Sequence, residues 1–346
     1  MRLYLLAAVL LAGLGCDRDG DEFVGAPPVG DKKAVKSPPK TAVAASPATA
    51  ASCKSCHPAI VAEWQTSMHS QSTAHADPIF AVLKGKAVQV LGAKGEKRCR
   101  NCHYASWSAT IEAKDEEPVG VTCSVCHSIA EGHPVATLPG GDMAALAREH
   151  EGNRDPQGLC LSCHAELKTG KGVPVCTTGA EARAAGDKQC VDCHMQMVAG
   201  SPSTSGKGDR HRVHRFAGGH DPAVVREAAT LEMEREGGRV VVTVANRKTG
   251  HAVPTGNPLR FLLARVEQLD GAGNVVWSNI EGDAMPPLAS GAVFMKVFSS
   301  KDGKKPVPPF MSVGHPQDSR LQPGEVRELR YPVAKGAAKV RATLEY

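Results

Sequence analysis

Five copies of the pattern Cys-x-x-Cys-His stand in the first 194 residues of a 346-residue chain and use ten of its twelve cysteines. Two thiols one helical turn apart can each add to a vinyl group of a haem, and the imidazole of the next residue can then bind the iron. The pattern therefore predicts five covalently bound haem c groups. The predicted attachment residues are Cys53, Cys56, Cys99, Cys102, Cys123, Cys126, Cys160, Cys163, Cys190 and Cys193, and the predicted proximal iron ligands are His57, His103, His127, His164 and His194.

Three other uses of paired cysteines explain the pattern less well. Structural zinc sites use Cys-x-x-Cys pairs but need no histidine directly after every second cysteine. Disulfides account for an even number of cysteines but not for histidines in fixed positions. A thioredoxin-like redox site needs a single pair beside a strand-helix-strand unit. Two cysteines, Cys16 and Cys176, lie outside the motifs, and we expect Cys176 to be an inert thiol.

The N-terminus predicts export from the cytoplasm. Residues 1–15 combine a charged start, an apolar run too short to span a bilayer, and a small-residue junction. Cys16 stands where a bacterial lipoprotein carries its lipid-modified cysteine, although Gly13 replaces the leucine usual at that place. A plain secretion signal with an incidental cysteine is the alternative. Both interpretations predict a periplasmic or cell-surface protein, and the first adds a membrane anchor through Cys16.

Composition predicts a multidomain chain of three further parts. Residues 16–52 are rich in Pro, Ala, Lys, Asp and Ser and cannot bury a core, so we expect a disordered tether. Residues 53–222 hold all five motifs and few aromatic side chains, which predicts a mainly α and irregular domain with haem in its core. Residues 223–346 change to β-branched runs between glycine turns and predict an antiparallel β-sandwich, immunoglobulin-like in its seven short strands.

Local patterns place individual elements in these domains. Pro58 suits the first position of a helix with Trp64 on its apolar face. The pattern Thr178-x-x-Glu181 predicts a capping box at the start of another helix. The pair Gly237-Gly238 predicts a hairpin turn between two strands, and 293–298 reads as one further strand.

A six-coordinate haem iron needs a second axial ligand besides the motif histidine. Nine histidines remain outside the motifs and are candidates for this role. Their number allows bis-histidine ligation at every haem, which favours low-spin centres with no vacant iron position. Helix faces, a glycine-bearing loop and a rigid turn between strands favour some of these histidines over others. The preferred distal ligands are His69, His150, His214, His220 and His251.

The other four histidines are alternatives. His211 can replace His214, because the register of that loop is not fixed by the sequence. His75, His133 and His315 rank lower, because the first lies one loop beyond His69 and the other two precede prolines in predicted loops.

Four stretches of the chain carry a resemblance to a known family. They are Cys53–His57 followed by Trp64-x-x-Ser67-x-His69, Cys190–His194 followed by Met195, His214-Arg-Phe216-x-Gly-Gly219, and Gly250-His251-x-x-Pro254-Thr-Gly256. From residue 53 to about residue 260 the chain resembles multihaem c-type cytochromes related to the tetrahaem electron carrier of ammonia oxidisers, and more distantly hydroxylamine oxidoreductase and pentahaem nitrite reductase. The resemblance implies closely stacked haem pairs, bis-histidine ligation at most irons and electron transfer outside the cytoplasm.

Two departures separate the chain from the enzymes of that group. Pentahaem nitrite reductases usually have one motif that ends in lysine, whereas all five motifs end in histidine here. Hydroxylamine oxidation needs more haems and a cross-linked tyrosine, and Tyr104, the tyrosine near the motifs, is expected to be a packing residue. We therefore expect an electron carrier more than a catalyst.

The predicted function is electron transfer from a membrane quinol-linked donor to a periplasmic or extracellular acceptor. One alternative is a reductase or oxidase of a small nitrogen or sulfur compound at an open haem, and another is a subunit of a conductive extracellular assembly. Nucleic-acid binding is not indicated. Without Arg2 of the predicted signal the formal net charge falls from +5 to +4, and five ferric haems with ionised propionates, at about −1 each, would bring it to about −1.

Overall fold

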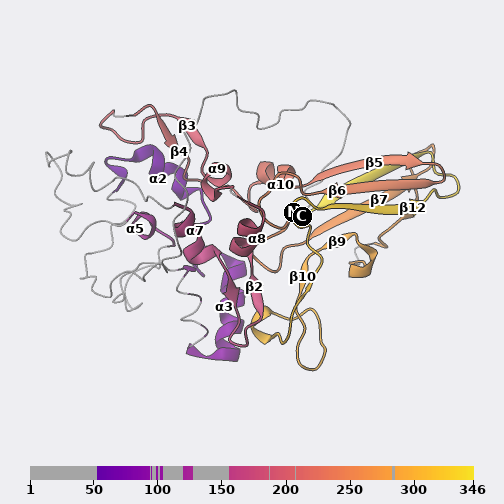
Figure 1. Ribbon diagram of the computed structural model, residues 1–346, viewed down its shortest axis with the longest axis horizontal. Helices are drawn as coiled ribbons and strands as arrows, with labels where there is room; N and C mark the ends of the chain where they lie inside the picture. Colours follow the sequence, from indigo (N-terminus) through magenta and orange to yellow (C-terminus); the bar gives the residue numbers. More distant parts are fainter. Residues whose placement is uncertain are drawn as a thin grey trace.

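The computed structural model describes residues 53–93, 95, 99, 102–103, 120–127, 156–186, 188–206, 208–282 and 285–346. The predicted signal segment and tether, with Cys16, Tyr104, His133 and His150, lie outside these residues. Helices gather at one end of the long axis and the larger antiparallel sheets lie at the other (Figure 1). Among the helices of the described residues, none combines the length and the apolar character that a membrane crossing requires.

Short helices and two-stranded hairpins make up the part of the chain that carries the motifs. They are α2 (Pro58–Gln65), α3 (Pro78–Leu91), α5 (Cys123–Cys126), α7 (Pro156–His164), α8 (Thr178–Ala184), α9 (Cys190–His194), α10 (Pro222–Ala228), and the pairs β1 (Leu167–Lys168) with β2 (Pro174–Cys176) and β3 (Met197–Ala199) with β4 (Arg210–Arg212). The third, fourth and fifth motifs thus lie on α5, α7 and α9 or at their ends. In the first motif the His57 N–H donates to the Cys53 carbonyl at 2.8 Å, which closes one helical turn.

Pro58 begins α2 as predicted, because a proline at the first helical position gives up no intrahelical hydrogen bond. The helix buries Val61 and Trp64. The indole N–H of Trp64 donates to the Val121 carbonyl at 2.9 Å and so ties α2 to the segment just before the third motif. Helix α3 starts in a similar way, with Asp77 accepting hydrogen bonds from backbone N–H groups of its first turn.

Helix α8 begins at Thr178, but the predicted capping box does not form. The N-cap residue is Thr177, and its side chain makes no hydrogen bond to the backbone of the helix start. Instead the Thr177 hydroxyl donates to the Glu181 carboxylate at 2.5 Å. The same carboxylate accepts a hydrogen bond from Arg320 of the β-domain at 2.6 Å. The local sequence pattern does not reveal this partner.

The C-terminal part consists of β-strands. They are β5 (Thr230–Glu236), β6 (Arg239–Ala245), β7 (Leu262–Leu269), β8 (Val275–Ser278), β9 (Val293–Phe294), β10 (Lys296–Val297), β11 (Gln317–Asp318), β12 (Val326–Pro332) and β13 (Lys339–Glu345), with 3-10 turns at Leu288–Ser290 and Pro309–Met311. One sheet has the order β12-β6-β5, a second has β13-β7-β8 with β9 also on β7, and β10 pairs with β11. All these pairings are antiparallel.

The two larger sheets pack against one core. Val242 and Val244 of β6, Val266 of β7 and Phe294 of β9 are fully buried in it. The predicted hairpin forms between β5 and β6, and Gly237 takes a φ of 56°, as the two-residue turn requires. An antiparallel β-domain is therefore confirmed, whereas its assignment as an immunoglobulin-like sandwich stays a prediction.

The strand predicted at 293–298 is divided. Residues Val293–Phe294 join β7, whereas Lys296–Val297 leave that sheet and pair with β11. Met295 stands between them and exchanges hydrogen bonds with Ser319, through its N–H to the hydroxyl at 3.1 Å and its carbonyl to the Ser319 N–H at 2.9 Å. The run is apolar apart from Lys296, and its sequence does not reveal that Ser319 lies opposite Met295.

Candidate functional site

Three motif histidines face a histidine from elsewhere in the chain. The ring centroids are 6.2 Å apart for His164 and His69, 6.2 Å for His127 and His214, and 6.3 Å for His194 and His251. An imidazole nitrogen binds a first-row metal at about 2 Å and the ring centre lies about 1 Å behind it, so rings on opposite sides of one metal have centres about 6 Å apart. The spacing therefore fits an iron between the members of each pair.

Backbone carbonyls orient the rings of the site. An Nδ1–H that donates to a carbonyl leaves Nε2 as the nitrogen available to a metal. The Nδ1-to-oxygen distances are 2.7 Å for His57 and Pro202, 3.0 Å for His103 and Ser72, 2.6 Å for His194 and Ala217, 2.7 Å for His214 and Arg212, and 3.0 Å for His251 and Ala252. Three motif histidines and two of the preferred distal histidines thus share the orientation typical of metal ligands.

Burial favours the neutral form of three preferred distal imidazoles. It lowers the pKa of His69 to about 4, and the neighbouring His164 contributes to the shift. Burial also lowers the pKa of His214 and of His251, although the carbonyl that each ring contacts acts in the opposite direction. Because a neutral imidazole is the form that binds a metal, the environment suits the predicted role.

Neighbouring cysteines join the five motifs into one cluster. The sulfur of Cys53 lies near that of Cys123, Cys102 near Cys163, and Cys160 near Cys190, and Cys126 is close enough to Cys163 to interact with it electrostatically. The fourth motif therefore lies near the second, third and fifth, and the third lies near the first. No disulfide joins any two of the eleven described cysteines. The predicted attachment points consequently converge within one domain.

The structure separates the two candidates that share a loop. His214 faces His127, whereas Nε2 of His211 lies 3.1 Å from a Glu63 carboxylate oxygen and its Nδ1 lies 2.9 Å from the Gly200 carbonyl. These two partners, the Gly200 carbonyl first, raise the pKa of His211. The second oxygen of Glu63 accepts from the His214 backbone N–H at 2.8 Å. His211 thus belongs to the support of the loop, and Glu63 of α2 fixes that loop from across the domain.

Phe216 packs against two of the preferred distal histidines. Its ring centroid lies 4.3 Å from that of His69 and 5.7 Å from that of His214. Its φ is 48°, a left-handed conformation that is costly for an aromatic residue. Gly219, three residues on, lies where a Cβ would meet Arg260 at 2.7 Å, so this glycine allows close contact with the β-domain.

The remaining candidates lie elsewhere. His220 is exposed, and within the described part of the chain its ring does not face a motif histidine as in the three pairs. His75 and His315 are exposed as well, and the preferred ligand His150 and the lower-ranked His133 fall outside the described residues. The roles of His220 and His150 as distal ligands stay predictions.

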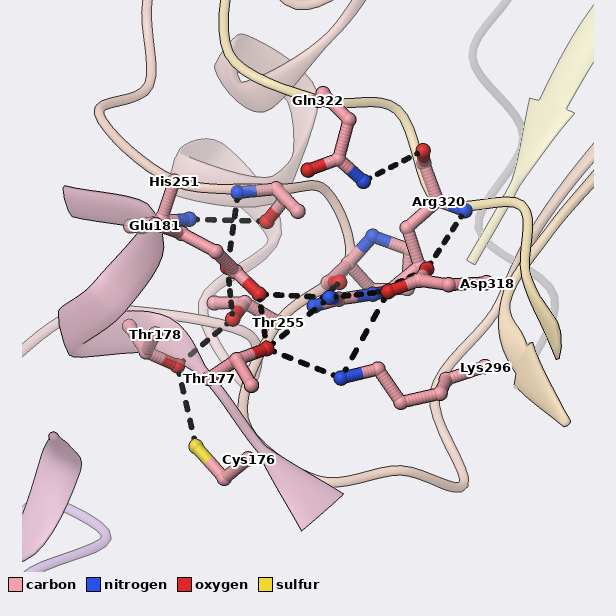
Figure 2. A network of polar contacts seen from close by, with 12 residues as sticks. Cys176, Thr177, Thr178, Glu181, His251, Thr255, Lys296, Asp318, Arg320 and Gln322 are labelled. Atoms are coloured by element: carbon pink, nitrogen blue, oxygen red, sulfur yellow. Dashed lines mark hydrogen bonds and ion pairs between the residues drawn. The ribbon is translucent and has the colours of Figure 1, made fainter. Parts of the chain in front are cut away.

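A buried ion pair joins the helical part and the β-domain beside His251 (Figure 2). Arg320 donates to Glu181 at 2.6 Å, with the two side chains 7% and 9% exposed. Asp318 lies 2.8 Å from the same guanidinium, and Lys296 lies 3.7 Å from Asp318. Burial opposes the charge of Glu181, but hydrogen bonds from Thr177 and the charge of Arg320 outweigh it and hold the pKa of Glu181 below its ordinary value. Sequence reasoning missed this cluster, because its members stand in three segments that are far apart in the chain.

Known proteins resemble the chain in two ways. The sequence model of the family "Cytochrome c554 and c-prime" matches residues 52–128. The solved structure of a penta-heme cytochrome c552 from Thermochromatium tepidum superposes with a TM-score of 0.66 at 28% identity, covering 86% of this chain and 90% of that one. Together these findings support a multihaem c-type cytochrome with covalently bound haem c. No curated protein matches the chain significantly. The finer relation to hydroxylamine oxidoreductase and pentahaem nitrite reductase stays a prediction.

Proposed function

We propose that the protein is an electron carrier of the bacterial envelope that holds five haem c groups, most of them with two histidine ligands. Three facing histidine pairs, at 6.2 to 6.3 Å between ring centres, carry this proposal. Haem c supplies one-electron chemistry at its iron when it is bound. The chain attaches it through ten thiols, orients the axial imidazoles through carbonyls, and fills both axial positions.

Three of the proposed axial pairs are the histidines whose ring centroids lie 6.2 to 6.3 Å apart. His164 is paired with His69, His127 with His214, and His194 with His251. Each pair joins a motif histidine to one from a distant segment, so ligation also holds the fold together. The proximal residues His57 and His103 take their second ligands from the other two preferred histidines, His150 and His220.

The contiguous cluster of motifs supports a carrier. Cysteines of every motif lie near those of another motif, and those of the fourth lie near three others, so the attachment points form one connected group. A carrier that is filled on both axial sides exchanges electrons with partner proteins and offers no iron position to a substrate. We therefore place the donor and the acceptor outside this chain, as a membrane quinol-linked protein and a periplasmic or extracellular protein.

The location of the protein in this proposal follows from the N-terminal sequence. Lipid attached to Cys16 anchors the chain to a bacterial membrane, and residues 16–52 act as a tether between the anchor and the first motif. The lipid-bearing peptide from membrane extracts can be identified by mass spectrometry. An unmodified Cys16, or cleavage beyond it, would favour the plain secretion signal instead.

Spin state distinguishes a carrier from an enzyme with an open iron. We expect the ferric protein to give only low-spin signals in electron paramagnetic resonance, and the ferrous protein to leave its optical spectrum unchanged under carbon monoxide. A stoichiometric high-spin signal together with carbon monoxide binding would contradict full axial ligation. It would point to reduction or oxidation of a small molecule at that iron.

A further inference from the structure

We infer that Glu181 is the positioning residue for His251: from the helical part of the protein, its carboxylate fixes the β-domain loop that presents this histidine to His194. The inference rests on the proposed function, because His251 acts there as an axial ligand. Glu181 itself touches neither ring, and it reaches His251 through the peptide of the next residue.

Hydrogen bonds saturate the Glu181 carboxylate. One oxygen accepts from the Arg320 guanidinium at 2.6 Å and from the Thr177 hydroxyl at 2.5 Å. The other accepts from the Ala252 backbone N–H at 3.1 Å and from the Thr255 hydroxyl at 3.0 Å. Three of these four donors belong to the β-domain, although Glu181 lies on α8. A charged acceptor with donors across a domain boundary holds the two sides in one relative position.

Ala252 transmits this contact to the imidazole. Its N–H donates to Glu181, and its carbonyl lies 3.0 Å from Nδ1 of His251. Ala252 therefore connects Glu181 to the His251 ring, because the residue that Glu181 holds is also the one whose carbonyl orients that ring. This orientation leaves Nε2 of His251 as the nitrogen available to a metal. Figure 2 shows Glu181, His251 and Thr255 gathered at this point, with Arg320 behind them.

Contacts within the β-domain hold the other side of the loop. The side chain of Asn246 donates to the His251 carbonyl at 2.8 Å, and the Thr249 hydroxyl donates to the same oxygen at 2.6 Å. Val253 and Leu321 exchange backbone hydrogen bonds at 2.9 and 3.0 Å. These contacts fix the conformation of the loop, whereas Glu181 fixes the position of the loop relative to the fifth motif.

Charge gives Glu181 a second effect on the same site. Glu181 and Asp318 face Arg320 and Lys296, so two carboxylates balance two cations in a buried cluster. Loss of the Glu181 charge alone leaves an excess positive charge beside His251. Because net charge near an iron is one of the factors that set its reduction potential, that potential is expected to rise.

Four variants of the full haem-loaded protein test the inference. Glu181→Ala removes the contact with Ala252, and Glu181→Gln keeps the size of the side chain but removes its charge. His251→Ala shows what loss of the ligand looks like. Glu345→Gln is the matched control, because Glu345 binds Arg265 at 2.8 Å within the β-domain, with side chains 18% and 17% exposed. The measurements are amide hydrogen exchange of a peptide over 249–256, electron paramagnetic resonance, and redox titration.

We expect Glu181→Ala to speed exchange of the Ala252 amide at least about tenfold and to show part of the high-spin signal of His251→Ala, at unchanged haem content. Glu181→Gln is expected to keep the low-spin spectrum and to raise the potential of one haem, which still tests the inference if Glu181→Ala fails to fold. Unchanged exchange and spectra in both variants, or equal changes in Glu345→Gln, would overturn it. A wild-type protein without haem would instead refute the proposed function, while the exchange measurement would still decide whether Glu181 holds the loop.

Discussion

The ring centroids of His194 and His251 lie 6.3 Å apart, and the planes of the two rings make an angle of 15°. His194 belongs to the fifth motif, whereas His251 belongs to the β-domain. This pair makes the β-domain part of the site. The Glu181–Arg320 ion pair crosses the same boundary. The two parts of the chain therefore depend on each other, and changes in the β-domain are expected to be visible in the haem spectra.

Replacement of His251 by methionine tests that dependence. Methionine can bind iron but stabilises the reduced state more than histidine does, so His251→Met is expected to raise the reduction potential of one haem and leave the others near their original values. Redox titration followed by optical spectroscopy measures this. His315→Met is the control, because His315 is exposed on a β-domain loop. Equal titration curves for the two variants would refute the proposed role of His251 as an iron ligand.

The neighbouring residues His211 and His214 are expected to respond differently to alanine. His214→Ala should open one iron to carbon monoxide, because His214 faces His127. His211→Ala should keep every haem low-spin but lower the free energy of unfolding by about 1–3 kcal/mol, since it removes the hydrogen-bond partner of Glu63. Carbon monoxide difference spectra and denaturant unfolding separate the two effects. An open iron in the His211 variant alone would reverse the assignment.

Local patterns were sufficient to predict several elements. Pro58 starts α2 because of a property of proline alone, and Gly237 allows the β5–β6 turn because of a property of glycine alone. The prediction for the five motif histidines has a similarly local basis, the spacing of Cys-x-x-Cys-His, and their role as iron ligands stays a prediction. In contrast, the choice between His211 and His214 depends on Glu63, which lies about 150 residues away in sequence.

The hydrogen bonds and ion pair that Glu181 makes with the β-domain were not predictable from the sequence. In sequence, Glu181 stands at the place of a capping-box residue, and only the fold brings Arg320 to it. The division of 293–298 into β9 and β10 has the same kind of cause, because Ser319 binds Met295 between them. A single sequence contains no information on such long-range partners unless they form a recognisable motif.

Phe216 offers a test of backbone strain beside the site. Phe216→Ala is expected to lower the free energy of unfolding by about 1–3 kcal/mol and to shift the signals of the two haems that we propose His69 and His214 bind. Phe216→Gly should cost about 1 kcal/mol less than the alanine variant, because glycine tolerates the φ of 48°.

The control for Phe216 is Phe261→Ala, a half-buried phenylalanine of the β-domain. It should lower stability without a change in the haem spectra. Denaturant unfolding together with electron paramagnetic resonance distinguishes the two sites. If the glycine variant at 216 proved less stable than the alanine variant, the left-handed conformation would be refuted.

Acid should weaken the ion pair of Asp318. Burial opposes its charge, but the hydrogen bond and charge of Arg320 hold the pKa of Asp318 below its ordinary value of about 3.9. A lowered pKa stabilises the folded state above the ordinary pKa, and this stabilisation disappears as the pH falls below it. Asp318→Asn should therefore cost about 1–3 kcal/mol at pH 7, and less and less as the pH falls below about 4.

Unfolding by denaturant at several pH values measures this difference between wild type and Asp318→Asn. Asp302→Asn is the matched control, because Asp302 forms an exposed pair with Lys304 at 3.0 Å. It should show no measurable change at any pH. A stability difference for Asp318→Asn that stayed constant from pH 7 to pH 3 would contradict the assignment.

Haem content tests the central claim most directly. A pyridine haemochrome assay combined with the intact mass of the protein, matured in cells that attach haem c, counts the groups bound to each chain. We predict five, all retained after denaturation because thioether bonds hold them at the ten motif cysteines. Fewer than five, or haem that is lost on denaturation, would contradict the account.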